Sequence, residues 1–169
     1  MPKKKLHEKY PLAGRCGLYC GACGAYRSQF DGETLKSIIA IKWDIPVEKL
    51  HCDGCGSASE GTLCYGCTFI KCLDEKGLSY CGECPEFEAD TCEEFKKAAD
   101  GYMEVYGVDI RKNMMLVREG KIKEWLSSAA ESFKCKKCRG PLIAGEANCH
   151  HCEEPTDKKN DNKPVTVDD

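Results

Sequence analysis

Cysteine is the residue type that could carry chemistry in this chain. Fifteen of its 169 residues are cysteine, an odd number. Cysteine thiolates bind metal ions, whereas thiols in an oxidising compartment form disulfides. The cysteines fall into two blocks, and none lies between Cys92 and Cys135. We expect all of them to be metal ligands: Cys16, Cys20, Cys23, Cys52, Cys55, Cys64, Cys67, Cys72, Cys81, Cys84 and Cys92 in the first block, and Cys135, Cys138, Cys149 and Cys152 in the second.

The choice of metal over disulfides follows from the compartment. The N-terminus is basic, but no apolar segment follows it, so we expect no secretory signal. No stretch approaches the roughly 18 apolar residues of a membrane helix. We therefore expect a cytoplasmic protein with reduced thiols. The hydrophobic share of 41% includes the cysteines, and we expect bound metal to replace part of an aliphatic core.

The second block has the strongest local signal. Cys135 and Cys138 form one Cys-x2-Cys pair, and Cys149 and Cys152 form another. Each pair makes a tight turn, or knuckle, whose two sulfurs reach one ion, and two knuckles complete a tetrahedral zinc site. The residues between the pairs suit a short hairpin. The sequence therefore predicts a zinc ribbon over residues 134–154, with His150 and His151 at its surface rather than among its ligands.

The first block contains a similar double knuckle. Cys52-Asp-Gly-Cys55 and Cys64-Tyr-Gly-Cys67 have glycine before the second cysteine, which suits a backbone that must approach the metal closely. We expect one zinc site from these four cysteines. A further four could form a second site, although interleaved pairing between the two sets stays open: Cys72, Cys81, Cys84 and Cys92.

Cys16, Cys20 and Cys23 have the C-x3-C-x2-C spacing with which radical S-adenosylmethionine enzymes hold an iron–sulfur cluster. Those enzymes need a large α/β barrel, for which this chain is too short. We expect instead a third structural site, completed by another cysteine or by Asp31 or His51. In total the sequence predicts about three to four zinc ions.

An iron–sulfur cluster is the competing occupant of the first block. Four cysteines serve zinc and iron–sulfur centres alike. The bacterial ferredoxin run of closely spaced cysteines is absent, and the Cys84-Pro85 pair ends a plain Cys-x2-Cys. We favour zinc and keep the cluster as the alternative.

Four segments have helical periodicity. One runs from Glu33 to Trp43, and the rest of the first block is expected to be loop and turn. A second runs from Glu93 to about Tyr106, with Asp90 or Thr91 as its N-cap. Asp109 caps a third, closed by Gly120, and the fourth spans residues 121–133. Tyr102, Tyr106, Met114 and Met115 are candidate partner contacts, although a core position is the favoured interpretation for each taken alone.

The expected fold is a small metal-stabilised, α-rich one with little β structure. Short amphipathic helices pack a block of cysteine knuckles and loops, and a zinc ribbon follows. We expect an N-terminal arm at residues 1–13, a cysteine-rich helical metal-binding domain at 14–133, the ribbon at 134–154 and a disordered tail at 155–169.

These motifs are familiar. Cys16-Gly-Leu-Tyr-Cys-Gly-Ala-Cys-Gly-Ala-Tyr26, the two knuckles that follow, Ile70-Lys-Cys72, and Cys81-Gly-Glu-Cys84-Pro-Glu-Phe87 resemble the domain-of-unknown-function family 3795. The resemblance runs over about residues 14–126 and ends in Glu124-Trp125-Leu126. It implies a small cysteine-rich prokaryotic domain that binds metal, and it implies no reaction. The ribbon resembles an appended zinc-ribbon module.

The sequence gives little support for catalysis. The four histidines, His7, His51, His150 and His151, form no zinc-hydrolase motif, and no phosphate-binding loop or nucleophile elbow is present. We expect a multi-zinc interaction or scaffold module with a protein partner, and iron–sulfur electron transfer or cluster carriage is the alternative.

Nucleic-acid binding is a second alternative. It depends on four cations at the first ribbon knuckle that could hold a phosphate backbone: Lys134, Lys136, Lys137 and Arg139. Each four-thiolate zinc site would carry about −2, which adds to the formal net charge of −3 and disfavours generic binding.

Overall fold

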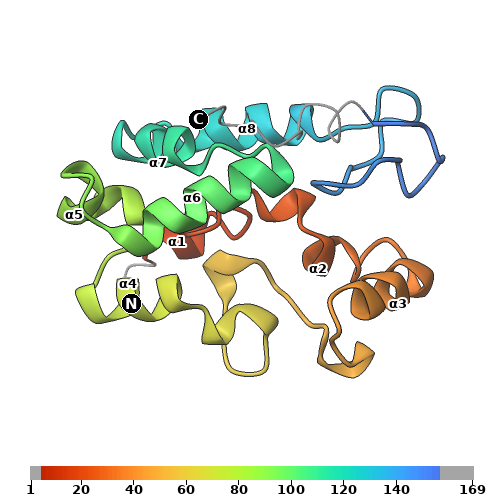
Figure 1. Cartoon of the computed structure of the whole chain (residues 1–169), viewed down its shortest axis with the longest axis horizontal. Helices are drawn as coiled ribbons and strands as arrows, with labels where there is room; N and C mark the ends of the chain where they lie inside the picture. Colours follow the sequence, from red (N-terminus) through yellow and green to blue (C-terminus); the bar gives the residue numbers. More distant parts are fainter. Residues whose placement is uncertain (1–4, 157–169) are drawn as a thin grey trace, which may run out of the picture.

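Short helices and cysteine-bearing turns make up this chain. The computed structural model describes residues 5–156, and Figure 1 shows their arrangement. The helices are α1 Leu6–Lys9, α2 Gly24–Arg27, α3 Glu33–Lys42, α4 Thr68–Lys76, α5 Pro85–Glu88, α6 Glu93–Tyr106, α7 Ile110–Arg118 and α8 Ile122–Ser132. The 3-10 turns are η1 Cys20–Ala22, η2 Val47–Lys49, η3 Cys55–Ser57, η4 Leu63–Gly66 and η5 Cys81–Glu83.

β structure is nearly absent from this part of the chain. The only β structure in residues 5–156 is a set of isolated antiparallel bridges. Two of them involve the ribbon, between Lys134 and Pro141 and between Asn148 and Pro155. The predicted α-rich fold with little β structure is therefore confirmed. None of the helices in the described part is long and apolar enough to span a membrane.

The three C-terminal helices form where the sequence predicts them. α6 ends at Gly107, which adopts the left-handed conformation typical of a helix end. The Asp109 side chain accepts a hydrogen bond from the Lys112 backbone N–H at the start of α7. The N-cap of α6 is Cys92 rather than Asp90 or Thr91. Thr91 instead hydrogen-bonds to the carbonyl of Glu86, within α5.

α7 is the centre of the main hydrophobic core. It packs against α6, α8 and the η5 turn. Ile110, Met114 and Tyr80 are fully buried, and Trp125 is buried beside them. Met114 is therefore a core residue, which was the favoured interpretation of the sequence, and it is not available as a partner contact. Its sulfur accepts a hydrogen bond from the Gly82 N–H.

α4 is a helix that the sequence prediction missed. Residues 68–76 were expected to be loop because of the surrounding glycines and cysteines. Ile70 and Leu73 lie on its buried face, and Gly77 ends it in the left-handed conformation. The apolar positions are helically spaced, so the signal was present and was outweighed by the glycine-rich context. α4 also carries Cys72.

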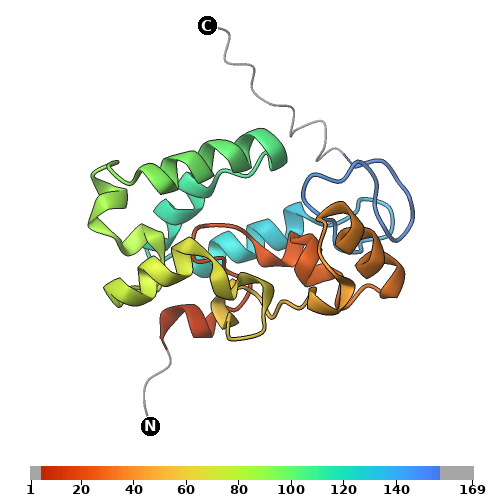
Figure 2. The same cartoon turned by 60° about the horizontal axis from the view of Figure 1, so that its bottom comes forward.

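The ribbon packs directly against the α2 and α3 side of the molecule. Figures 1 and 2 both show its blue loops beside the orange α3 helix. Ile143 is buried in a core cluster with Leu35, Ile39 and Leu50. The backbone N–H of Ala144 donates to the carbonyl of Ala22 at 2.9 Å, and Lys42 forms an ion pair with Glu146.

The ends of the described chain belong to the fold. Residues 5–13, expected to be an arm, include α1, and His7 and Ala13 are buried. Thr156, at the start of the expected tail, is buried and hydrogen-bonded to the carbonyls of Ala147 and Glu146. The remaining tail prediction, residues 157–169, lies outside the described residues.

Candidate metal centres

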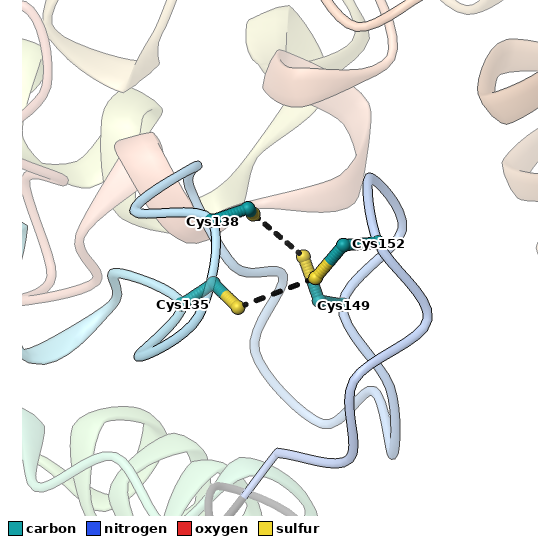
Figure 3. Close-up of side chains that lie close together, drawn as sticks. All are labelled: Cys135, Cys138, Cys149 and Cys152. Carbon is teal, nitrogen blue, oxygen red and sulfur yellow. Dashed lines mark hydrogen bonds between the residues drawn. The ribbon is translucent and has the colours of Figure 1, made fainter.

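The ribbon brings its four predicted ligands together. The sulfurs of Cys135, Cys138, Cys149 and Cys152 all lie within 4.8 Å of one another. Figure 3 shows the two knuckles facing each other, with the sulfurs directed into the space between them. The Sγ atoms of Cys135 and Cys152 are 3.6 Å apart, and those of Cys138 and Cys149 are 3.7 Å apart.

These sulfur distances match a tetrahedral metal site. A Zn–S bond is about 2.3 Å long, so tetrahedral angles place two sulfur ligands about 3.8 Å apart. The ribbon and the first block also share a turn in which a glycine N–H, two residues after a cysteine, donates to that cysteine's sulfur. The Gly140 N–H donates to Cys138 Sγ at 3.4 Å, as the Gly54 N–H donates to Cys52 Sγ at 3.4 Å in the first block. The ribbon can therefore hold a metal ion with four thiolates.

The ribbon thiols have divergent proton affinities. Backbone N–H groups, that of Cys138 first, lower the pKa of Cys135 to about 6. The backbone N–H of Glu154 favours the thiolate of Cys152, but burial and the neighbouring thiols raise its pKa to about 12. Several thiolates this close repel one another, and a bound cation removes that repulsion.

In the first block, one group of sulfurs forms around Cys55. Its Sγ lies 3.8 Å from Cys64 Sγ, and its N–H donates to Cys20 Sγ at 3.4 Å. Cys64 also hydrogen-bonds to Cys52. The group therefore combines Cys20, Cys52, Cys55 and Cys64. The four sulfurs of the expected double knuckle do not all lie within 4.8 Å of one another, and Cys67 interacts electrostatically with Cys16.

A second group lies around Cys81. Four other cysteines lie close enough to act electrostatically on its thiol: Cys16, Cys92, Cys72 and Cys84. Together with Cys81, the last three make up the four-cysteine set that the sequence spacing suggested. Lys76 Nζ also donates a hydrogen bond to Cys84 Sγ at 3.6 Å. Neither first-block group has the tight geometry of the ribbon, since within residues 5–156 no other set of cysteines has three sulfurs all within 4.8 Å of one another.

Thiols in the first block resist ionisation. Hydrogen bonding to Cys64, followed by burial, raises the pKa of Cys52. Burial raises the pKa of Cys81 and raises that of Cys16 to about 11. The hydrogen bond with Cys52 favours the thiolate of Cys64, but the one with Cys55 and burial outweigh it, and its pKa rises to about 12. All fifteen cysteines are free of disulfides, so a cation is what would stabilise these groups as thiolates.

The basic knuckle of the ribbon is largely ion-paired. Lys134 and Arg139 both contact Glu131, and Lys137 Nζ lies 2.9 Å from a carboxylate oxygen of Glu154. These pairs are exposed and individually weak. They nevertheless reduce the positive charge that is available to bind a phosphate backbone, so the number of lysines and arginines overstates it.

A second group of potential ligands was missed by the sequence prediction. Asp31 lies beside His150 and His151, and their ligand atoms are all within 4.8 Å of one another. His150 is partly buried rather than at the surface, and Asp31 faces these histidines rather than completing a site with Cys16, Cys20 and Cys23. His51 contacts only Asp53 among the charged residues described. No local sequence signal joins residue 31 to residue 150, because the contact depends on how the ribbon docks.

The comparisons with known proteins agree with the cysteine pattern. A family model described as a protein of unknown function, DUF3795, matches residues 12–97, about half of the chain. The match covers all eleven first-block cysteines, from Cys16 to Cys92, and it stops short of the ribbon. No curated protein and no solved structure matches the chain. The chain belongs to the DUF3795 family.

Proposed function

We propose that this chain is a multi-zinc protein whose thiolate sites are structural. The observation that carries the proposal is the ribbon, where four sulfurs from two knuckles lie at tetrahedral spacing. Four thiolates leave no coordination position for water, which is the arrangement of a structural rather than a catalytic zinc site. In this role the metal fixes the ribbon against α2 and α3.

The groups around Cys55 and Cys81 support two further thiolate sites in the first block. With the ribbon, they bring the expected content to about three zinc ions per chain. An iron–sulfur cluster is the competing occupant of the first block, because four cysteines serve both kinds of centre. Iron and acid-labile sulfide in the purified protein would decide for the cluster.

Replacing one ribbon ligand tests the ribbon site. Cys138→Ser is expected to remove about one zinc ion per chain, because the serine hydroxyl is not a zinc ligand at neutral pH. The matched control is Cys138→His. Cys138 is exposed, so a larger ring fits there, and a set of three cysteines and one histidine binds zinc. Elemental analysis of both variants gives the result, and equal zinc in Cys138→Ser and the unmodified protein would contradict the proposal.

The interaction role has one supporting feature on the surface. Ile38, Ile41 and Val47 are exposed, Ile41 by 81%, on α3 and the η2 turn. Adjacent exposed apolar side chains are typical of contact surfaces. We include protein binding by this face in the proposal. Ile41→Glu is expected to abolish binding of a co-purifying partner, whereas Val105→Glu, at another exposed apolar position, on α6, is expected to leave it unchanged.

We do not extend the proposal to nucleic acid. Three of the four cations at the first ribbon knuckle are paired with Glu131 or Glu154. Metal-bound thiolates would add negative charge next to them.

A further inference from the structure

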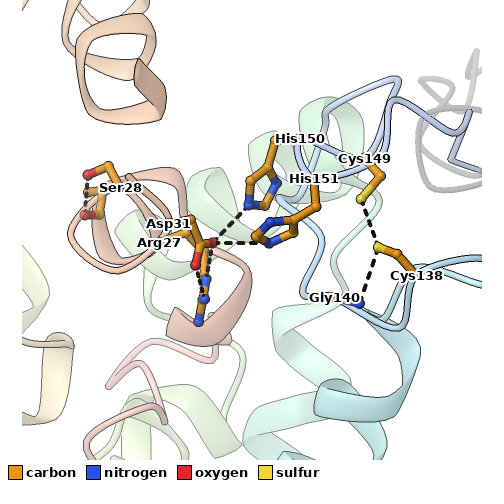
Figure 4. A network of polar contacts seen from close by, with 9 residues as sticks. Arg27, Ser28, Asp31, Cys138, Gly140, Cys149, His150 and His151 are labelled. Atoms are coloured by element: carbon orange, nitrogen blue, oxygen red, sulfur yellow. Dashed lines mark hydrogen bonds and ion pairs between the residues drawn. The ribbon is translucent and has the colours of Figure 1, made fainter. Parts of the chain in front are cut away.

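Asp31, His150 and His151 form a cluster of nitrogen and oxygen ligands beside the ribbon. Asp31 lies in the turn between α2 and α3, and the histidines lie between the two cysteines of the second knuckle. Figure 4 shows both imidazole rings directed at the carboxylate. The side chains of Asp31 and His150 are 6% and 13% exposed, whereas that of His151 is 35% exposed. The cluster is thus built into the docked face and is open to solvent on one side.

The spacing of the ligand atoms suits a divalent ion. Asp31 Oδ2 lies 2.8 Å from His150 Nε2 and 3.7 Å from His151 Nε2. Zinc bonds to nitrogen and oxygen are about 2.0–2.1 Å long, so tetrahedral angles place two such ligands about 3.3 Å apart. The two distances lie on either side of that value. Shifts of about half an ångström in the imidazole positions would complete the geometry.

We propose that Asp31, His150 and His151 bind a divalent first-row transition ion, at a site separate from the four-cysteine centre. Two imidazoles and one carboxylate supply three ligands and leave a coordination position for water. The set contains no thiolate, so it differs in chemistry from the cysteine groups found among residues 5–156. It rests on the proposed function in one respect, because zinc in the ribbon fixes the knuckle that carries both histidines.

Arg27 supports this site rather than occupying it. Its guanidinium donates from Nε to Asp31 Oδ2 at 2.8 Å and from Nη2 to Oδ1. A carboxylate has about four lone-pair positions, so these two bonds leave room for a metal. Hydrogen bonds of this kind orient a metal-ligating carboxylate. The competing explanation is a purely ionic network in which Arg27, Asp31 and His150 fasten the ribbon to the domain.

A metal titration separates the two explanations. The full chain is first treated briefly with a mild chelator, which removes metal from a three-ligand site before it removes the thiolate-bound zinc. Titration with cobalt(II) is then followed by calorimetry and by visible absorption. We expect about one equivalent to bind, with absorption bands that lack thiolate charge transfer. His151→Gln and Asp31→Asn are expected to weaken this binding at least about tenfold.

His51→Gln is the matched control. His51 Nε2 also contacts a carboxylate, that of Asp53 at 3.2 Å, but no third ligand joins them among the described residues. This variant is expected to bind cobalt as the unmodified protein does. Because His151 is exposed, its substitution should leave the fold intact, and circular dichroism together with retained ribbon zinc verifies this.

The outcomes distinguish this site from the ribbon. Equal cobalt binding in His151→Gln and the unmodified protein would overturn the site, and so would a thiolate charge-transfer band on the added cobalt. If Asp31→Asn lowers the melting temperature without changing cobalt binding, the ionic network is correct and the metal site is wrong. In each of these cases zinc loss in Cys138→Ser would still support the structural ribbon zinc.

Discussion

Complete removal of bound metal is expected to unfold the chain. Metal binding in structural zinc sites contributes about 10–16 kcal/mol in small zinc domains, whereas a whole domain is stable by only about 5–15 kcal/mol. Loss of the ions therefore exceeds the stability that remains. The measurement is the helical circular dichroism signal during treatment with excess chelator under reducing conditions, with the released metal quantified in the same sample.

The reason for so large an effect is that cysteine occupies interior positions. Cys52 belongs to the core cluster that joins α3 to the ribbon, and Cys16 and Cys81 belong to the main core. Without metal, these positions would hold buried thiols that no longer form metal–thiolate bonds, and the core would lose their stabilising contribution. The control is the same chelator saturated with zinc, which cannot remove the ions. Retained helical signal and melting behaviour after the metal has left would contradict this prediction.

Gly54→Ala is expected to destabilise the protein by about 3 kcal/mol. A Cβ atom at this position would lie 2.3 Å from the carbonyl oxygen of Pro11, and the φ angle of 89° disfavours any side chain. The obstacle is backbone, which cannot rotate away. The substitution would also displace the knuckle between Cys52 and Cys55. Chemical denaturation of the metal-loaded protein measures the loss.

Gly66→Ala is the matched control for this prediction. Gly66 precedes Cys67 as Gly54 precedes Cys55, so the two positions are equivalent in the sequence. A Cβ atom at residue 66 would have no neighbour within 4 Å. We expect Gly66→Ala to stay within about 1 kcal/mol of the unmodified protein. Equal effects of the two substitutions would show that the approach of Pro11 to Gly54 is not as close as the structure has it.

Much of the helical fold could be predicted because apolar spacing and caps are local signals. The α7 helix is the example, since Asp109 begins it and Ile110 and Met114 recur at the spacing of a buried face. α4 was missed because the surrounding glycines and cysteines indicated loop. Local sequence signals do not show which element packs against each helix face. For this reason Met114 stayed a candidate partner contact as well as a candidate core residue.

The ligand set of the ribbon could be predicted, whereas the grouping of the first block could not. In the ribbon, the four cysteines lie within one short hairpin, so spacing determines which sulfurs meet. In the first block, Cys20 reaches Cys55 from a distant segment, and the contact depends on the packing of η1 against η3. The contact between Asp31 and His150 joins residues that are even farther apart in the sequence, and it depends on how the ribbon docks against the rest of the chain.

The central claim is that cysteine thiolates hold metal ions in this fold, and X-ray absorption at the zinc edge tests it most directly. The sample is full-length protein purified without oxygen, with its metal content measured in parallel. We predict about three zinc ions in thiolate sites per chain and a dominant shell of sulfur at about 2.3 Å. A correctly folded sample without bound metal, or with zinc surrounded only by oxygen, would contradict the account.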